Sequence, residues 1–536
     1  MQARCPTSES SQKRAGPEQP PEEGGGDIRR RTARGLSWRF VTVATQFVLQ
    51  MGVGIVLARL LPPEDFGLIG LALIAINFGR IVSDLGLAQS MIQREELTSR
   101  QIRVGFTSST LLGCAVAGAV FSLSPWFAGF FSEPRITEVL RVISGTFVFI
   151  GLGITSEALL KRRLEFSRLM AVEIASYGLG YGLVAVAMAL AGYGVWSLVC
   201  GTLAQASLKT IVAYSLVRHP ALPLLRGREF GQLATFGVGA SLHKLFNFFA
   251  RKGDYFVIGH LLGAAPLGLY ERAYRTMEGP LAQTGHVLAT VLFPAVSRIQ
   301  KDVPRVRSAY GKAMSMTSLV ILPVMVMMIL LAEELIVGLL GDKWQGAVQP
   351  FRILCAFGLF RATYHVAGSF VKATGRIYRL VLLQIVYAGL ILGGTWIACS
   401  HFGLEEAALA VGLAITVMYL MQVGVANSAV RMPIVDFLAL HAAPLIAGAL
   451  TAAICGALRQ ALVTLGAPRL IVLGAAVLLT PVLLVASLHA LPRVATRPVA
   501  SLLHEVLDQG VLPAAFAEKL RRLLPRRAEG GGKERG

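Results

Sequence analysis

Several lysine and arginine residues lie inside segments that otherwise have the length and composition of membrane-spanning helices. A charge at bilayer depth costs about 3 kcal/mol or more, so such residues face a protein interior or a water-filled cavity. They recur at helical spacing with other polar residues, which places each set on one face of a helix. The sets are Arg39, Thr42, Gln46 and Gln50; Asn77, Arg80 and Asp84; Lys244, Asn247, Arg251 and Asp254; and Glu271, Arg275 and Glu278. The pattern is typical of a transporter.

The apolar segments account for most of the chain. Of its 536 residues, 54% are hydrophobic and 15% charged, and the mean hydropathy is +0.61. A soluble domain would carry more charge and shorter apolar runs. Because a helix needs about 20 apolar residues to cross the bilayer, we predict an all-α integral membrane protein with about fourteen transmembrane helices. The predicted segments are 36–61, 66–92, 104–131, 136–160, 171–191, 193–217, 232–260, 267–296, 312–340, 347–371, 377–400, 404–429, 434–458 and 468–490.

The net charge of +20 is distributed unevenly between the loops. Alternate gaps between the predicted helices hold 19 and 6 lysine or arginine residues, and both tails belong with the richer set. Because positively charged loops remain on the cytoplasmic side, both termini are predicted to be cytoplasmic, which requires an even number of spans. The alternation indicates membrane orientation and argues against a nucleic-acid partner.

The chain contains an internal repeat. Residues 57–61 and 66–68 match residues 258–262 and 267–269 at a constant offset of 201. Six predicted spans separate the copies, so the two halves have the same orientation. A parallel repeat predicts two six-helix lobes around an axis along the membrane normal, with a central cavity at their interface.

These features divide the chain into five predicted parts. The tails have no apolar region long enough to span a membrane, and the second contains an amphipathic segment suited to a membrane surface. The parts are a disordered cytoplasmic tail at 1–34, an N lobe of helices 1–6 at 35–228, a C lobe of helices 7–12 at 229–431, two extra helices at 432–491, and a cytoplasmic tail at 492–536.

The residue patterns of common enzyme sites are missing from the sequence. It has no G-x-x-x-x-G-K-[ST] phosphate loop and no H-E-x-x-H zinc motif, and its six cysteines are scattered without metal-ligand spacing. The predicted loops are about fifteen residues at most, which leaves no room for an extramembrane catalytic domain. We therefore expect no catalytic residues, no metal and no cofactor.

Several stretches in order along residues 35–430 resemble the polysaccharide-transporter (Wzx-type flippase) family of the MOP exporter superfamily. The most telling are Leu57-Ala-Arg-Leu-Leu-Pro-Pro-Glu-Asp-Phe-Gly67, Ala158-Leu-Leu-Lys-Arg-Arg-Leu-Glu-Phe166, Asp254-Tyr-Phe-Val-Ile-Gly259, Leu292-Phe-Pro-Ala-Val-Ser-Arg298 and Leu340-Gly-Asp-Lys-Trp344. The last two predicted helices and both tails lie outside the resemblance.

The resemblance implies a function and a set of partners. Members of this family are expected to flip undecaprenyl-pyrophosphate-linked oligosaccharides across the bacterial inner membrane by alternating access, for O-antigen or exopolysaccharide synthesis. The partners are then the lipid-linked oligosaccharide and membrane lipids, with a polysaccharide polymerase and a chain-length regulator as further candidates. Guanidinium groups suit this substrate because they bind phosphate oxygens in bidentate geometry.

Two other functions compete with this interpretation. A cation-coupled multidrug exporter of the same superfamily would favour an acidic, aromatic cavity, whereas the polar stripes here are predominantly basic. A membrane-embedded glycosyltransferase or ligase would need an extended loop or domain for its acidic residues, and the loops are short. A scaffold that transports nothing would leave the polar stripes without a purpose.

The candidate site residues follow from the stripes. The substrate-binding cations are Arg80, Lys244, Arg251, Arg272, Arg275 and Arg39, and the residues for ion coupling or charge balance are Asp84, Asp254, Glu271 and Glu278.

Each candidate also has a structural alternative. Arg39 is near the start of its helix, where its side chain can reach the interface. Arg251 and Asp254 can form a structural ion pair, and ion pairing is the commoner fate of the acidic residues. Trp344, near a predicted boundary, is expected in the aromatic belt at the membrane surface.

Overall fold

The structure is a computed structural model that describes residues 45–94, 97–220, 222–227, 230–231, 248, 251–300 and 302–490. Within this part, the side chains of 282–295, 297–298, 377–378, 481 and 484–490 are not described. The predicted tails at 1–34 and 492–536 lie outside the described residues. The described residues form helices joined by turns, with no β-strand among them, which agrees with the predicted all-α class.

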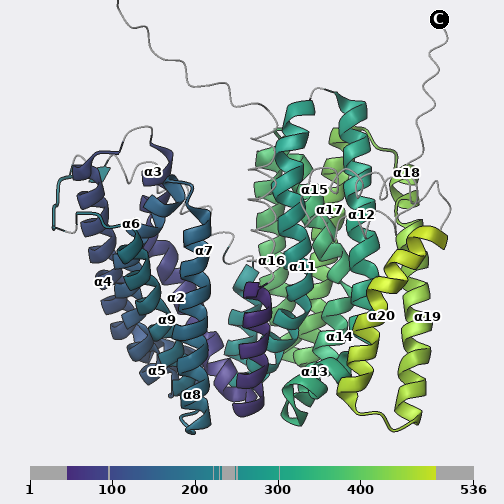
Figure 1. Ribbon diagram of the computed structural model, residues 1–536, viewed down its shortest axis with the longest axis horizontal. Helices are drawn as coiled ribbons and strands as arrows, with labels where there is room; N and C mark the ends of the chain where they lie inside the picture. The colour runs from purple at the N-terminus through teal and green to yellow at the C-terminus, as the bar shows by residue number, and fades with distance from the viewer. Residues whose placement is uncertain are drawn as a thin grey trace, which may run out of the picture.

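Two helical lobes stand side by side (Figure 1). The helix Thr45–Leu60 lies between them. The first lobe contains α2 (Pro63–Asp84), α3 (Leu87–Gln93), α4 (Ser99–Phe130), α5 (Ile136–Ile143), α6 (Gly145–Arg162), α7 (Phe166–Ala175), the π-helix η1 (Ser176–Leu183), α8 (Val184–Leu190) and α9 (Val195–Leu216).

The second lobe begins with the helical residues 251–261. Two further long helices, α19 and α20, pack against its α12 and α13, so they form the predicted appendage to the core. The elements are α11 (Ala264–Ile299), α12 (Val303–Leu330), α13 (Ala332–Leu340), the 3-10 helix η2 (Asp342–Ala347), α14 (Val348–Ala356), α15 (Gly358–Ala373), α16 (Ile377–His401), α17 (Leu404–Val430), α18 (Ile434–Ala439), α19 (Ala442–Thr464) and α20 (Arg469–Ala490).

Local sequence signals start and stop these helices. Thr98 and Gln101 form a capping box at the start of α4, each side chain hydrogen-bonded to the other residue's backbone N–H. The predicted span 66–92 is interrupted because Leu85 and Gly86 both adopt a left-handed conformation, with φ of 37° and 69°. This pair ends α2 at Asp84 and starts the separate helix α3.

Nine helices in the described part of the chain are long and apolar enough to cross a membrane. The helices Thr45–Leu60 and Arg469–Thr480 are apolar but shorter. The protein is therefore a multi-pass helical membrane protein, as predicted, while the number fourteen stays a prediction. The predicted span 312–340 is in fact two helices, α12 and α13, separated at Leu331.

The lobes contact each other where α2 crosses α11, through a reciprocal pair of glycines. A Cβ atom at Gly67 would lie 1.7 Å from the carbonyl oxygen of Ala264, and one at Gly268 would lie 1.9 Å from that of Pro63. Gly268 follows Gly67 by 201 residues, and Ala264 follows Pro63 by the same 201. Each glycine thus contacts the repeat equivalent of the residue that the other glycine contacts. Contacts across a two-fold axis have the same reciprocal form. This is the geometry predicted from the repeat.

Trp344 lies in this contact region and not in an aromatic belt. It is fully buried, its ring packs edge-on against Phe66 at 5.3 Å, and its Nε1–H donates to the carbonyl oxygen of Ala58 at 2.9 Å. The expectation of a membrane-surface position is therefore wrong, because the tryptophan is buried where the lobes contact each other. Whether Trp344 lies at the membrane surface or in this contact depends on partner residues that are remote in sequence.

Candidate functional site

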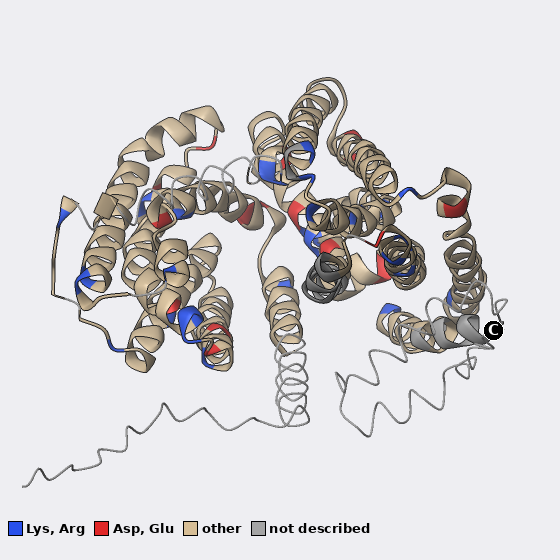
Figure 2. Cartoon of the chain, turned by 90° about the horizontal axis from the view of Figure 1, so that it is seen from above, with Lys and Arg blue, Asp and Glu red and all other residues tan. Residues whose placement is uncertain are grey.

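Helical residues 251–261 and α11 bring a group of charged side chains together in the second lobe. The Tyr270 hydroxyl donates to Asp254 Oδ2 at 2.7 Å, and both residues are buried. The Lys252 ammonium lies 3.6 Å from the ring centroid of Tyr255, which is a cation–π contact. Lysine, arginine and acidic residues are seen together among the helices of this lobe in Figure 2.

Glu278 on α11 links two arginines of this group. Its Oε1 accepts from Arg361 Nη2 at 2.7 Å and lies 3.6 Å from Arg251 Nη2. Arg251 thus pairs with Glu278, so the alternative in which it pairs with Asp254 is wrong. Asp254 instead accepts a hydrogen bond from the hydroxyl of Tyr270 on α11.

Arg361 on α15 is a member of the group that the stripe analysis missed. It is 4% exposed, and its guanidinium lies 5.0 Å from the ring centroid of Tyr274. A signal was present in the sequence, because Arg361 falls inside the predicted span 347–371. No acidic or amide residue lies at helical spacing from it in that span. Arg361 therefore belonged to no polar stripe and was not predicted as a site residue.

Glu271 lies close to the two remaining candidate cations, Arg272 and Arg275. Its Oε1 lies 3.3 Å from Arg275 Nη1, and its Oε2 lies 3.8 Å from Arg272 Nε. The buried Arg272 guanidinium also lies 3.9 Å from the ring centroid of Phe66 on α2. Arg272 therefore stacks against the opposite lobe, while the Arg275 side chain is 60% exposed.

The group has an excess of positive charge. Arg251, Lys252, Arg272, Arg275 and Arg361 supply five positive charges against three negative ones from Asp254, Glu271 and Glu278. Glu271 and Glu278 are each paired with arginines of the group, and Asp254 accepts a hydrogen bond from the Tyr270 hydroxyl. We call these eight residues the C-lobe charge cluster.

The C-lobe charge cluster lies close to the first lobe. A Cβ atom at Gly54 would lie 3.3 Å from Arg272 Nη1, and one at Gly279 would lie 3.1 Å from the ring of Phe47. The helix Thr45–Leu60 therefore packs against α11. Tyr177 and Tyr181 of η1 lie within electrostatic range of Arg272 and Arg275. The cluster is thus at the interface of the lobes.

Arg80 and Asp84 belong to a different place. Both line a cavity of about 580 Å³ inside the first lobe, between α2, α3, α6 and α9. Asp84 Oδ1 accepts from the Ala88 backbone N–H at 3.2 Å and so helps to start α3. The cavity lining contains no residue of the C-lobe charge cluster. The structure therefore separates Arg80 from Arg251, Arg272 and Arg275.

Two of the predicted site residues, Arg39 and Lys244, lie outside the described part of the chain. A substrate role or a coupling role for the other candidates remains a prediction from the sequence. Among the described residues, no group of three or more His, Cys, Asp or Glu side chains could hold a metal ion.

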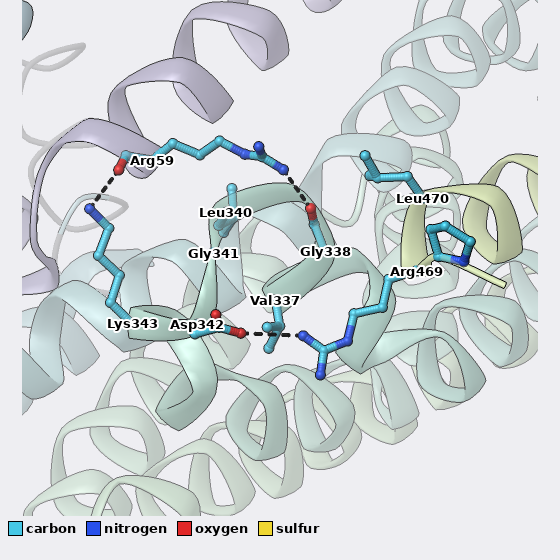
Figure 3. A pocket seen from close by; sticks show the side chains of 10 residues that line it. Arg59, Val337, Gly338, Leu340, Gly341, Asp342, Lys343, Arg469 and Leu470 are labelled. Atoms are coloured by element: carbon cyan, nitrogen blue, oxygen red, sulfur yellow. Dashed lines mark hydrogen bonds and ion pairs between the residues drawn. The ribbon is translucent and has the colours of Figure 1, made fainter. Parts of the chain in front are cut away.

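Hydrogen bonds also join the helix Thr45–Leu60, which leads into α2 of the first lobe, to the second lobe at the end where α2 and α11 begin. Arg59 donates to the carbonyl oxygens of Leu339 and Gly338 at 2.8 and 2.7 Å, and Lys343 Nζ donates to the Arg59 carbonyl at 2.8 Å (Figure 3). On the other repeat, His260 Nδ1 bonds the Phe130 carbonyl oxygen at 2.7 Å. His260 follows Arg59 by 201 residues, so the same position of each repeat bonds to a backbone carbonyl across the interface, although the two sets of carbonyls are not themselves equivalent.

Known proteins are similar to this chain in sequence and in fold. Lipopolysaccharide biosynthesis protein WzxC of Escherichia coli (strain K12) is 26% identical over 361 residues, which cover 65% of this chain and 71% of that protein. Teichuronic acid biosynthesis protein TuaB of Bacillus subtilis (strain 168) is 26% identical over 337 residues, which cover 60% of this chain and 69% of that protein.

Two solved transporters share the fold. The inward closed conformation of the lipid II flippase MurJ superposes with a TM-score of 0.65, covering 83% of this chain and 97% of MurJ, at 14% identity. An inward-facing multidrug resistance MATE family transporter of the MOP superfamily gives a TM-score of 0.57, covering 72% of this chain and 94% of that one, at 16% identity. These values establish the same architecture.

The family match covers more than half of the chain. Residues 56–349 match the family described as polysaccharide biosynthesis protein, a range that begins in the helix Thr45–Leu60 and ends at the start of α14. It includes both copies of the repeat, the α2–α11 crossing and seven of the eight residues of the C-lobe charge cluster. The chain therefore belongs to the polysaccharide biosynthesis protein family, and it has the two-lobed helical fold that it shares with MurJ and the MATE family transporter.

Proposed function

We propose that the protein flips an undecaprenyl-pyrophosphate-linked oligosaccharide across the bacterial inner membrane by alternating access, for the synthesis of a cell-surface polysaccharide. The observation that carries this proposal is the excess positive charge of the C-lobe charge cluster at the interface of the lobes. A pyrophosphate linkage is an anion that needs such charge to enter the membrane core. The family and the relatives WzxC and TuaB, which are named for lipopolysaccharide and teichuronic acid biosynthesis, support a role in polysaccharide synthesis, and the fold shared with the lipid II flippase MurJ supports a flippase.

Arg251 and Arg275 are the cations best placed to bind the pyrophosphate. Their side chains are 58% and 60% exposed, and each is paired with one acidic residue at more than 3 Å. Inside a membrane span, an exposed arginine must face water or protein because lipid would leave its charge unsolvated. A phosphate group can replace part of that solvation through paired N–H donors. The buried Arg361 and Arg272 then position Glu278 and Glu271 beneath them.

The contact between the lobes supports alternating access. Among the described residues, the side-chain hydrogen bonds between the lobes all lie at the end where α2 and α11 begin. The loops richest in lysine and arginine lie toward the other end, which we assign to the cytoplasm. In this assignment the periplasmic side is closed, the charge cluster is reached from the cytoplasm, and both termini are cytoplasmic.

The charge balance disfavours the alternative of a drug exporter for cations. Five cations against three acids would repel a positively charged substrate, and every acid of the cluster is already paired. A polysaccharide polymerase and a chain-length regulator are the partners that this function requires downstream.

The test is to replace Arg251 and Arg275 by glutamine, singly and together, in a strain that depends on this protein for its surface polysaccharide. We expect the double variant to lose surface polysaccharide while its level in the membrane stays normal, and Arg251→Lys to retain part of the function. The matched control is Arg352→Gln on α14, whose one side-chain hydrogen bond is to Gln349 at 3.4 Å. Normal polysaccharide from the double variant would rule out this site.

A further inference from the structure

The cavity inside the first lobe is built like a ligand site but has no place in the mechanism above. Its volume of about 580 Å³ is within the range of small-molecule sites, roughly 300–1,000 Å³. Its walls carry charged, amide and hydroxyl groups beside branched apolar side chains. This mixture is suited to a sugar, which presents both hydroxyl groups and C–H faces.

The acidic residues of the cavity are already paired within the lobe. Glu157 Oε1 lies 2.9 Å from Lys209 Nζ, and its Oε2 lies 3.9 Å from Lys161 Nζ. Asp84 accepts a hydrogen bond from the backbone of α3. Lys209 Nζ also lies 3.8 Å from Glu173 Oε1, so both lysines have acidic partners.

Arg80 is the cation that these pairs leave over. Within the described part of the chain, its guanidinium makes no ion pair and no hydrogen bond, although it lines the cavity beside Glu157. The lining therefore has three cations, Arg80, Lys161 and Lys209, against two acids. A planar guanidinium with free N–H groups binds a carboxylate or a phosphate in bidentate geometry.

Two side-chain amides add neutral hydrogen-bonding groups to the charged groups of this cavity. Gln89 on α3 and Gln205 on α9 both line the cavity, and neither amide has a hydrogen-bond partner among the described residues. An amide offers two donors and one acceptor oxygen, which is the pattern that binds sugar hydroxyls. Thr202 and Thr210 donate their hydroxyl protons to backbone carbonyls and keep acceptor capacity toward the cavity.

We propose that this cavity binds an anionic sugar unit of the transported glycan, with Arg80 holding its carboxylate or phosphate group and Gln89 and Gln205 its hydroxyls. The inference rests on the proposed function, since it assigns the pyrophosphate to the C-lobe charge cluster and the glycan to the first lobe. The two ends of one substrate then contact the two lobes. An acidic glycan is favoured over a neutral one of the same size.

The test measures ligand binding to the purified full-length protein in detergent by titration calorimetry. The ligands are digalacturonate as an anionic disaccharide, cellobiose as a neutral one, and inorganic pyrophosphate as the charge of the lipid carrier. We expect digalacturonate to bind at least tenfold more tightly than cellobiose. Arg80→Gln should weaken digalacturonate binding at least tenfold and leave pyrophosphate binding unchanged, whereas Arg251→Gln should do the reverse.

Matched variants keep the result interpretable. Arg80→Lys should retain part of the affinity, Gln205→Leu should weaken both disaccharides, and Arg100→Gln, at an exposed arginine of α4 outside the cavity, should change nothing. Arg80 has no partner to lose, so its variants should keep the wild-type melting temperature.

Three results would overturn the proposal. The first is wild-type binding of digalacturonate by Arg80→Gln, and the second is equal binding of cellobiose and digalacturonate by the wild type. The third is a loss of pyrophosphate binding in Arg80→Gln, which would assign the cavity to the lipid carrier. In the first two cases, the proposed function would remain supported if pyrophosphate binding still depends on Arg251.

Discussion

Gly67 and Gly268 occupy equivalent positions in the two repeats, and each lies directly against the backbone of the other repeat's helix. No side chain fits between α2 and α11 at either point, because a Cβ atom would meet a carbonyl oxygen at less than 2 Å. The backbones of the two helices are therefore in direct contact at the crossing. It joins the lobes at one end and leaves their other contacts free to change.

Alanine at Gly67 or Gly268 should open this end of the protein. The added methyl group must displace backbone, and overpacking of this kind costs about 1–3 kcal/mol or more. We expect a longer distance between spin labels at Tyr193 and Leu465, two exposed residues near this end, in a cysteine-free background. Gly118→Ala is the control, because a Cβ at Gly118 meets nothing within 4 Å. An unchanged distance distribution in both variants would contradict the close contact.

Replacing Arg59 by glutamine should weaken the same closure without a steric clash. The variant loses two hydrogen bonds from a charged donor to the carbonyl oxygens of Gly338 and Leu339, worth about 1.5–3 kcal/mol each. The population with this end open should rise at least tenfold, as measured by the same spin-label pair. Arg135→Gln is the matched control, because Arg135 pairs with Glu64 and Asp65 inside one lobe. A stronger effect from the control than from Arg59→Gln would show that charge, and not the contact between lobes, sets the equilibrium.

Glu278→Gln should destabilise the second lobe through Arg361. The arginine is 4% exposed, and its Nη2 loses a charged partner at 2.7 Å. Removing one member of a buried pair typically costs about 3–5 kcal/mol. Adding Arg361→Met to the same protein should recover part of the loss, and a double-mutant cycle of unfolding free energies measures the coupling.

The exposed Glu405 provides the control for this cycle. Glu405→Gln, in the first turn of α17, should cost at most about 1 kcal/mol. Simple additivity of Glu278→Gln and Arg361→Met would contradict a direct interaction between the two side chains.

Acidification should destabilise the protein through His219, which follows α9 and lies outside the membrane-spanning segments. Burial lowers the pKa of His219, and its Nε2 lies 3.2 Å from the Ser156 hydroxyl. The unfolded chain then binds a proton more readily than the folded one below about pH 6.5. The stabilisation is complete above this pH and declines as the pH falls further.

The melting temperature measured between pH 7.5 and 5.5 checks this prediction. The decrease should be smaller in His219→Gln than in the wild type, by an amount that corresponds to about 1 kcal/mol. His401→Gln, at an exposed histidine of α16, should retain the decrease of the wild type. An identical pH dependence in His219→Gln and the wild type would exclude His219 as the titrating group.

The helical membrane class and the repeat could be predicted because both depend on patterns that the sequence contains directly. Apolar runs of spanning length leave little choice of architecture, since the bilayer demands internally bonded backbone. The match between residues 57–68 and 258–269 predicted lobes of equal orientation, and the reciprocal contact of Gly67 and Gly268 has this form. The stripes likewise placed Arg251 on the polar face of one helix and Glu271, Arg275 and Glu278 on that of the next, and the structure pairs Arg251 with Glu278 across them.

The partners of these residues were decided only by the tertiary structure. Helical spacing showed that Arg251 and Asp254 share a face, but not that Arg251 turns to Glu278 while Asp254 is taken by Tyr270. Arg361 entered the group, and Arg80 was placed in a separate cavity, because of packing between segments far apart in the chain. The sequence determines which side chains are too polar to face lipid. The crossing of α2 and α11 and the packing of α15 on α11 determine which charged partners these side chains have in the protein interior.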